Sequence, residues 1–301
     1  MYHSISFLSF QRRFSTEEKC RDYLFHCRWP NGFVCPKCNG THYSVIATRG
    51  LYQCSQCRHQ ASVRVGTIFE KSQTPLRKWF WAIYLLSQHK NSIAALTLSR
   101  FLNIAYWTAL SMTHKIRSAM ADRDARYQLS HLVEVDDAYF GGQRAPGKRG
   151  RGADKKTTVI VAVQLSAKEK PQYASMMAVE NMSEAQVTKT IKEQVTDKST
   201  IRSDAYSSYK VLEKHGYTHK PVIVSRSSNK SDLLKWVNIM ISNAKAVYRG
   251  THHGVSDKHL QKYLSEFCYR FNRRFDPSQL FDRLLTACVN SNHRAIAELF
   301  A

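Results

Sequence analysis

The stretch Val133-Glu134-Val135-Asp136-Asp137 decides the fold of the larger part of this chain. It has the pattern of a β-strand that ends in carboxylates, and Ile201-Arg202-Ser203-Asp204 repeats the pattern further along. If the two strands are neighbours in one sheet, Asp136 and Asp204 converge at its edge, while Asp137 points to the opposite face. Close carboxylates repel each other unless a cation lies between them, so a site for Mg²⁺ or Mn²⁺ is predicted. For either Asp alone, a turn or helix-cap role is the alternative.

The segments around this stretch alternate between strand and helix patterns. Further strands are predicted at 157–164, 173–179, 200–202 and 222–224, and helices at about 233–248, 257–272 and 277–288. This order indicates an α/β fold with a mixed sheet and flanking helices, which we assign to residues 128–301.

Two cysteine pairs, Cys35-Pro-Lys-Cys38 and Cys54-Ser-Gln-Cys57, predict a smaller N-terminal structure. Four thiolates at this spacing can close a tetrahedral Zn²⁺ site, which would fold a ribbon too small to fold alone. The alternatives are disulfides or unconnected buried cysteines. The other four cysteines show no pairing pattern, which indicates reduced thiols and a cytoplasmic location. We assign an N-terminal helix and the zinc ribbon to residues 1–70.

The composition points to a polyanionic partner. The chain has 301 residues with a formal net charge of +22, and at 43% hydrophobic residues it can bury a core. Such an excess of Lys and Arg attracts nucleic acid through counterion release. A membrane surface is discounted, because there is no signal peptide and no 18-residue apolar run.

Two further segments are candidates for binding DNA. Residues 71–127 show three helical patterns in the outline of a helix-turn-helix, with Lys115 and Arg117 on the third; a plain helical hairpin is the alternative. The Gly-rich segment 141–156 between the first two strands cannot pack as a core. A cationic loop of this kind can follow a phosphate backbone without reading bases, and a solvated surface loop is the alternative. Its basic residues are Arg144, Lys148, Arg149, Arg151, Lys155 and Lys156.

Four stretches make the chain resemble DDE-type bacterial insertion-sequence transposases with an N-terminal zinc ribbon and an RNase H-like, ISXO2-like catalytic domain. They are 28–38, 133–142, 203–206, and 250–256 continuing into 263–274. The resemblance covers about residues 20–275. It implies that the sheet of 128–301 is RNase H-like.

The resemblance implies that Asp136 and Asp204 are the first two metal ligands. The third is usually a Glu on a helix, followed seven positions later by a Lys; here those positions hold Asn238 and Lys245. Seven residues are about two helical turns, so both lie on one face. Asn offers a neutral oxygen, a weaker ligand than a carboxylate. Glu266 on the next helix is the substitute ligand to test, and an exposed helix charge is its alternative role.

The resemblance further implies that Lys245 contacts a DNA phosphate near the scissile bond, with a solvated charge as the alternative. His252 and His253, beside two glycines, favour a backbone or phosphate contact over metal binding. The implied function is a transposase that binds the terminal inverted repeats of its element and cleaves and transfers DNA strands. The partners that the resemblance implies are double-stranded DNA and further copies of this chain. A weak or inactive zinc-ribbon DNA-binding derivative, or a nuclease without strand transfer, are the alternatives.

Overall fold

The structure is a computed structural model that describes residues 5–141, 156–222 and 234–300, and it contains two compact units. One unit comprises residues 1–123 together with 275–301, and the other comprises 124–274. From the sequence, residues 275–301 were expected to belong to the sheet domain. In the structure residues 275–301 belong to the N-terminal unit instead, because α9 (Leu280–Val289) packs on α2 (Glu17–Arg28) and α3 (Leu76–Gln88).

The core of the first unit is aromatic. It is formed by α1 (Phe7–Arg13), α2, α3 and α9. Phe10 and Phe281 are both buried, with ring centroids 5.2 Å apart. Thr16 caps α2 by accepting a hydrogen bond from the amide of Lys19. The chain ends with α10 (Ile296–Phe300).

The ribbon is a three-stranded antiparallel sheet of β1 (Tyr43–Ile46), β2 (Leu51–Cys54) and β3 (Gln60–Ala61). Each cysteine pair forms the same turn. The residue after its second cysteine, Asn39 or Arg58, has a positive φ near 60° and donates its amide to the carbonyl of the first cysteine.

The four cysteine sulfurs fit a tetrahedral metal site. All lie within 4.8 Å of one another, and the Cys35–Cys57 and Cys38–Cys54 Sγ pairs are 3.6 Å apart. Zinc–sulfur bonds of about 2.3 Å place tetrahedral sulfurs about 3.8 Å apart, so the cluster has nearly the size that zinc requires. Donation from the Cys57 amide lowers the pKa of Cys54 to about 7, which favours the thiolate. The donor set and its geometry therefore suit zinc.

The helical segment contains α4 (Ala95–Leu102) and α5 (Tyr106–Asp124), joined by a short turn at Asn103. This outline agrees with the helix–turn–helix pattern in the sequence. Lys115 and Arg117 lie on α5, the third helix, as the sequence indicates, but they do not give it a basic surface. Both are buried, at 7% and 1% exposure, within a continuous buried run from Met112 to Met120.

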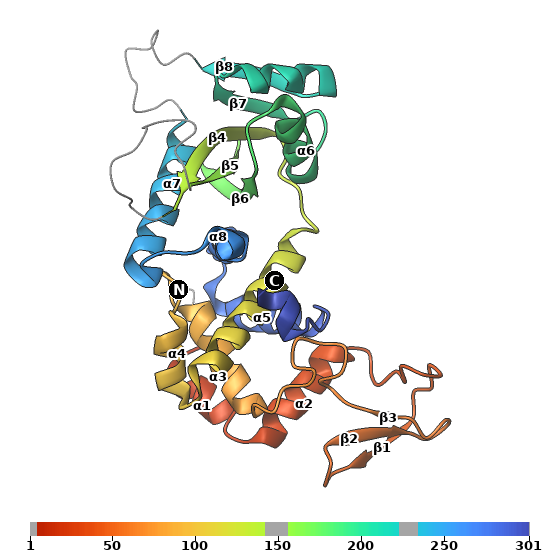
Figure 1. The fold of residues 1–301 in the computed structure, drawn as a ribbon. Coiled ribbons are helices and arrows are strands. Elements are labelled where there is room, and N and C mark those ends of the chain that lie inside the picture. The colour runs from red at the N-terminus through yellow and green to blue at the C-terminus, as the bar shows by residue number, and fades with distance from the viewer. Residues whose placement is uncertain (1–4, 142–155, 223–233, 301) are drawn as a thin grey trace. The chain divides into compact units, whose positions relative to one another are not determined.

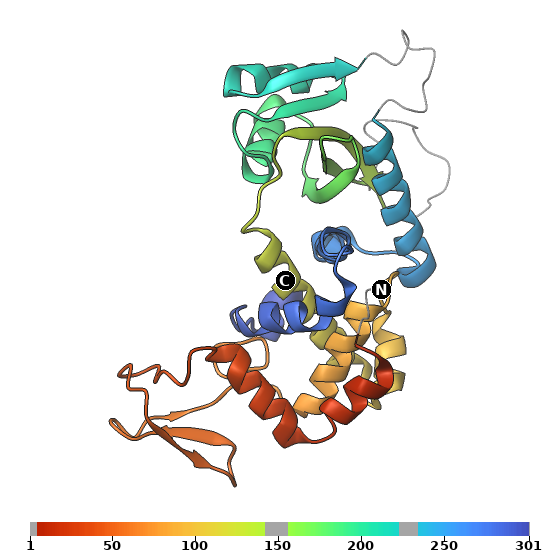
Figure 2. The ribbon, with the colours of Figure 1, turned by 180° about the vertical axis from the view of Figure 1, so that it is seen from behind.

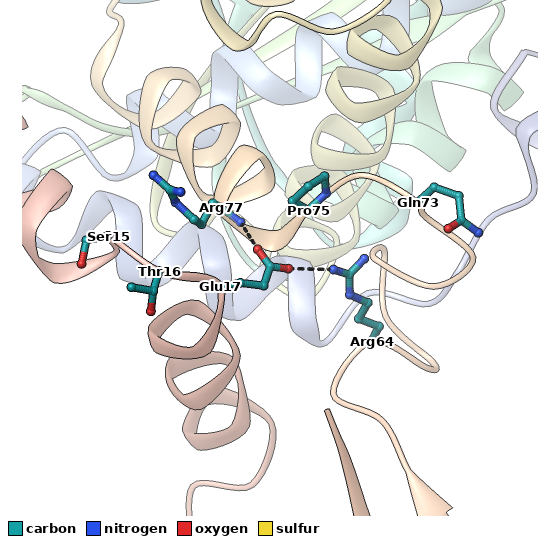
Figure 3. A pocket seen from close by; sticks show the side chains of 7 residues that line it. All are labelled: Ser15, Thr16, Glu17, Arg64, Gln73, Pro75 and Arg77. Carbon is teal, nitrogen blue, oxygen red and sulfur yellow. Dashed lines mark hydrogen bonds and ion pairs between the residues drawn. The ribbon is translucent and has the colours of Figure 1, made fainter. Parts of the chain in front are cut away.

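Glu17 joins α2 to the start of α3. Its carboxylate accepts hydrogen bonds from the amides of Leu76 and Arg77, at 2.7 and 3.1 Å, and pairs with Arg64 at 3.1 Å. Figure 3 shows this carboxylate between Arg77 and Arg64, in a pocket that Ser15, Thr16, Gln73 and Pro75 also line. Because α3 has no side-chain cap of its own, Glu17 supplies the acceptor that its first amides need.

The second unit is built on a five-stranded mixed sheet in the order β6-β5-β4-β7-β8 (Figure 1). The strands are β4 (Leu132–Phe140), β5 (Thr157–Leu165), β6 (Pro171–Val179), β7 (Thr200–Asp204) and β8 (Thr218–Val222). The first three strands pair antiparallel, while β7 and β8 add in parallel on the other side of β4. This is a mixed sheet with antiparallel and parallel strands, as the sequence predicts.

Helices cover both faces of this sheet. α7 (Lys235–Val247) and α8 (Asp257–Asn272) pack on one face with Ala138, Phe140 and the odd-numbered residues of β5. α6 (Glu184–Gln194) and the 3₁₀ segment η1 (Ser207–His215) pack on the other face with Val133, Val135 and Ile201. Figures 1 and 2 show α7 and α6 on opposite sides of the sheet. The even positions of β4 therefore face α7.

We expect purified protein to contain about one zinc ion per chain and Cys54→Ser to lose it, because three thiolates no longer close the tetrahedron. The ribbon should then unfold while the sheet of residues 124–274 stays folded. Elemental analysis and limited proteolysis measure the two effects.

Cys27→Ser is the matched control, since Cys27 lies in the same unit but outside the cluster. It should retain its zinc. Protein purified without chelators and found to contain no zinc would contradict the assignment.

Candidate catalytic site

Asp136 and Asp204 lie side by side on neighbouring parallel strands. In the β4–β7 pairing Glu134 is opposite Arg202 and Val135 is opposite Ser203, so the next residue on each strand is one of the two aspartates. Two residues earlier on each strand, the Arg202 guanidinium and the Glu134 carboxylate are 3.7 Å apart. Side chains two positions along a strand share a face, so Asp136 and Asp204 face the same side as that pair. The structure thus brings the two predicted carboxylates together.

Backbone amides orient both aspartates. Asp136 Oδ1 accepts from the amide of Asp137 at 2.8 Å, and Asp204 Oδ1 accepts from the amide of Tyr206 at 3.2 Å. Both side chains are partly exposed, which leaves room for a hydrated cation. Asp137 occupies the next position of β4 and therefore points to the opposite face, as predicted.

Glu134 holds the start of α7 against β4. The residue is 1% exposed, and its Oε2 accepts from the amides of Trp236 and Val237 at 2.9 and 3.0 Å. Burial raises the pKa of Glu134, and the two amides and Arg202 lower it. α7 has no side-chain cap of its own, so this strand carboxylate takes that place.

The far end of α7 meets the far end of β4, where the rings of Tyr248 and Phe140 have centroids 5.6 Å apart. From Glu134 to Phe140 the strand rises about 20 Å, and from Trp236 to Tyr248 the helix rises about 18 Å. The two elements therefore run in the same direction with matched lengths. Measured along this shared direction from Glu134, Asn238 comes before the position of Asp136 and Lys245 comes after it.

Asn238 is exposed, one residue beyond the Glu134 contact. Its Nδ2 donates to the carbonyl of Leu234 at 2.9 Å. Since a carbonyl can only accept, this bond fixes the orientation of the amide and leaves Oδ1 as the atom that can bind a cation. Asn238 has the correct atom for a metal ligand, on the helix that packs on β4.

Lys245 lies near Asp136 in a group of cations. Its Nζ is 5.6 Å from the centroid of the Phe140 ring. Burial has the largest effect on the pKa of Lys245 and lowers it; Arg249 and Lys156 lower it further, and Asp136 raises it. Lys245 is therefore partly buried and close to Asp136, and the alternative of a plain solvated charge does not describe it.

Glu266 does not join this site. It is 1% exposed and pairs with Arg270 at 3.1 Å, so its expected alternative as an exposed helix charge is also wrong. The residues of α8 that pack on the sheet include Leu264 and Cys268. Glu266 lies two positions from each, about 200° around the helix, and so points away from the sheet.

The two histidines and the basic residues of the Gly-rich segment are the other predicted site residues. Among the described residues the four ribbon cysteines form a group of three or more His, Cys, Asp or Glu side chains close enough to share a metal ion, and neither His252 nor His253 belongs to it. The His252 ring instead packs edge-on against Tyr263. Lys156 is exposed beside the site. The other basic loop residues, Arg144, Lys148, Arg149, Arg151 and Lys155, lie outside the described residues.

Sequence reasoning missed Glu134 and Arg249. A Glu between two valines of a predicted core strand is a signal for a buried, paired carboxylate, because such a charge is tolerated only with partners. Arg249 follows Lys245 by four residues, so helical spacing alone places it on the same face.

Two models of transposase domains match this chain. The ISXO2-like transposase domain matches residues 128–272, which contain Asp136, Asp204, Asn238 and Lys245, and the transposase zinc-ribbon domain matches residues 15–60. Together they match well over half of the chain.

Individual proteins are also similar. A Halobacterium salinarum protein described as an uncharacterized protein in transposable element ISH50 is 25% identical over 279 residues, covering 86% of this chain and 92% of that protein. A pre-cleavage Mos1 transpososome and a Mos1 strand transfer complex each show 12% identity, covering 75% of this chain and 82% of theirs, with TM-scores of 0.30 and 0.29.

Among the described residues, no helix combines the length and apolar character needed to cross a membrane. The sheet topology, the paired aspartates, the four-cysteine ribbon and the two family matches agree with one another. The chain belongs to the family of ISXO2-like DDE transposases that carry an N-terminal zinc ribbon.

Proposed function

We propose that this chain binds the terminal inverted repeats of its own mobile element, cleaves the DNA at the element's ends and joins the freed 3′-hydroxyl to target DNA. The observation that carries the proposal is the placement of Asp136 and Asp204 on one face of adjacent parallel strands. α7, which carries Asn238 and Lys245 and packs on the same face of the sheet, supports the proposal further.

Asp136, Asp204 and Asn238 Oδ1 would hold two Mg²⁺ or Mn²⁺ ions. Such ions, when bound, activate the attacking hydroxyl and stabilise the leaving oxygen of a phosphodiester. The protein's own contribution is positioning: the β4–β7 pairing fixes the carboxylates, and Lys245, with Lys156 and Arg249 near it, supplies positive charge for phosphate oxygens. A covalent protein intermediate is not required.

The ribbon, with one structural Zn²⁺, and the helical segment of residues 71–127 would recognise the repeats. We also propose that two or more copies of the chain pair two DNA ends, and that the protein acts in the cytoplasm at the nucleoid. The DNA that flanks the gene should contain short inverted repeats, and duplexes made from it are the substrates for the tests below.

Asp136→Ala and Asp204→Ala should each abolish cleavage and joining while DNA affinity changes little, because they remove metal ligands and no phosphate contact. Cleavage of end-labelled duplex and joining to a target plasmid measure the two steps. Wild-type rates in Asp136→Ala would reject the mechanism. Wild-type protein that binds the repeats but never nicks them would favour an inactive derivative, and nicking without joined product would favour a nuclease.

Asn238→Ala should lose most of the cleavage activity, because it removes both Oδ1 and the donor to Leu234. Asn238→Glu should retain or raise activity, most clearly with Mn²⁺, since a carboxylate is the stronger ligand. Glu266→Gln is the matched comparison and should cleave at a nearly normal rate. The opposite pattern, with Asn238→Ala normal and Glu266→Gln inactive, would show that Glu266 is the third ligand.

Neutralising Lys148, Arg149 and Arg151 to Gln should weaken binding about equally for repeat DNA and random DNA, because the loop is proposed to contact phosphates. The slope of log affinity against log salt should fall by roughly one unit for each lost contact.

The control changes Lys189, Lys192 and Lys198 to Gln. These exposed lysines lie on α6 and in the turn that follows it, outside the site. The control should bind both DNAs with nearly unchanged affinity. Loss of repeat binding with random binding retained in the loop variant would show that the loop reads bases.

A further inference from the structure

We propose that Glu134 is a positioning residue that sets the place of Asn238 relative to Asp136. The inference rests on the proposed function, because it assumes that these residues act as metal ligands. Glu134 itself is buried beneath the carboxylate pair and need not touch metal or DNA.

The contacts of Glu134 reach each part of the site. It lies two positions before Asp136 on the same face of β4. Its Oε2 accepts the amides of Trp236 and Val237, so the next residue of the helix is Asn238. Its Oε1 faces Arg202, which lies two positions before Asp204 on β7. One carboxylate therefore connects the three elements that carry the three proposed ligands.

The start of α7 needs such an anchor. Leu234, at the N-cap position, has φ 53° and ψ 37°, a left-handed conformation that is unfavourable for a leucine. Its side chain is buried in the core against the sheet, which prevents the chain from relaxing outward. Two charge-assisted hydrogen bonds to the following amides hold the first turn in place despite this conformation.

A second contact guides the same turn. The indole Nε1 of Trp236 donates to the carbonyl of Glu169 at 2.7 Å, and the Glu169 carboxylate pairs with Arg202 at 2.9 Å. Glu169 is largely exposed, and within the part of the chain that the structure describes its carboxylate accepts no hydrogen bond from an α7 amide. It therefore shares Arg202 with Glu134 but does not anchor the helix. Glu169 thus offers a matched control.

Glu134→Gln keeps the size of the side chain and one acceptor oxygen but removes the charge that two amides and Arg202 share. We expect the variant to fold and bind repeat DNA normally, and to bind Mn²⁺ about 10-fold or more weakly, as when partners that orient metal ligands are removed elsewhere. Cleavage should need correspondingly more Mn²⁺ and approach the wild-type rate at saturating metal. Glu169→Gln should match the wild-type protein in both.

Three measurements on the full chain decide the matter: Mn²⁺ binding by titration calorimetry without DNA, the metal dependence of cleavage, and hydrogen exchange of the peptide that covers the start of α7. The proposal expects faster exchange there in Glu134→Gln together with weaker Mn²⁺ binding. A folded Glu134→Gln with unchanged Mn²⁺ affinity overturns it, including a variant that only melts at lower temperature, because that result shows a structural role alone.

Failure of the proposed function has a different signature. In that case the wild-type protein itself neither binds Mn²⁺ at the carboxylates, as judged by comparison with Asp136→Ala, nor cleaves. The positioning of metal ligands would then be refuted together with the metal site, whereas the hydrogen-exchange comparison would still report whether Glu134 anchors α7.

Discussion

The parallel pairing of β4 with β7 is the constraint on which the proposed site depends. Side chains alternate along a strand, so a register slip of one residue would turn Asp204 away from Asp136. Packing prevents that slip, because Val133, Val135 and Ile201 are fully buried on the face covered by α6 and η1. The apolar residues of one face thereby fix the place of the carboxylates on the other.

A carboxylate from a remote segment completes the start of a helix in each unit. Glu17 accepts two amides of α3 and pairs with Arg64, and Glu134 accepts two amides of α7 and pairs with Arg202. Neither helix has a side-chain cap from its own N-cap residue. Each carboxylate satisfies donors that would otherwise lack a partner and also joins segments that are far apart in sequence.

The sequence predicted much of what depends on local pattern: four strands of the large sheet, the four-cysteine ribbon and the helical spacing of Asn238 and Lys245. The strand expected at 222–224 meets β8 (Thr218–Val222) only at Val222, and 223–224 lie outside the described residues. It could not predict which core the helices of 275–301 would join, because an amphipathic face does not specify its partner. The burial of Lys115 and Arg117 was missed for another reason: a charged side chain by itself predicts exposure to solvent. The amide contacts of Glu134 depend on tertiary packing and have no signature in the α7 segment itself.

The Asn at position 238 also has a local physical reason. Leu234 is held in a left-handed conformation, and its carbonyl accepts from both the backbone amide and the Nδ2 of Asn238. A Glu at this position has no donor for that carbonyl and would place negative charge beside it. If Asn238 is the third ligand, as proposed, the chain has exchanged one ligand charge for a better-bonded helix start. The site then holds two carboxylates beside the cations of Lys245, Arg249 and Lys156, so its metal ions are bound less by net charge and more by the fixed geometry of β4, β7 and α7.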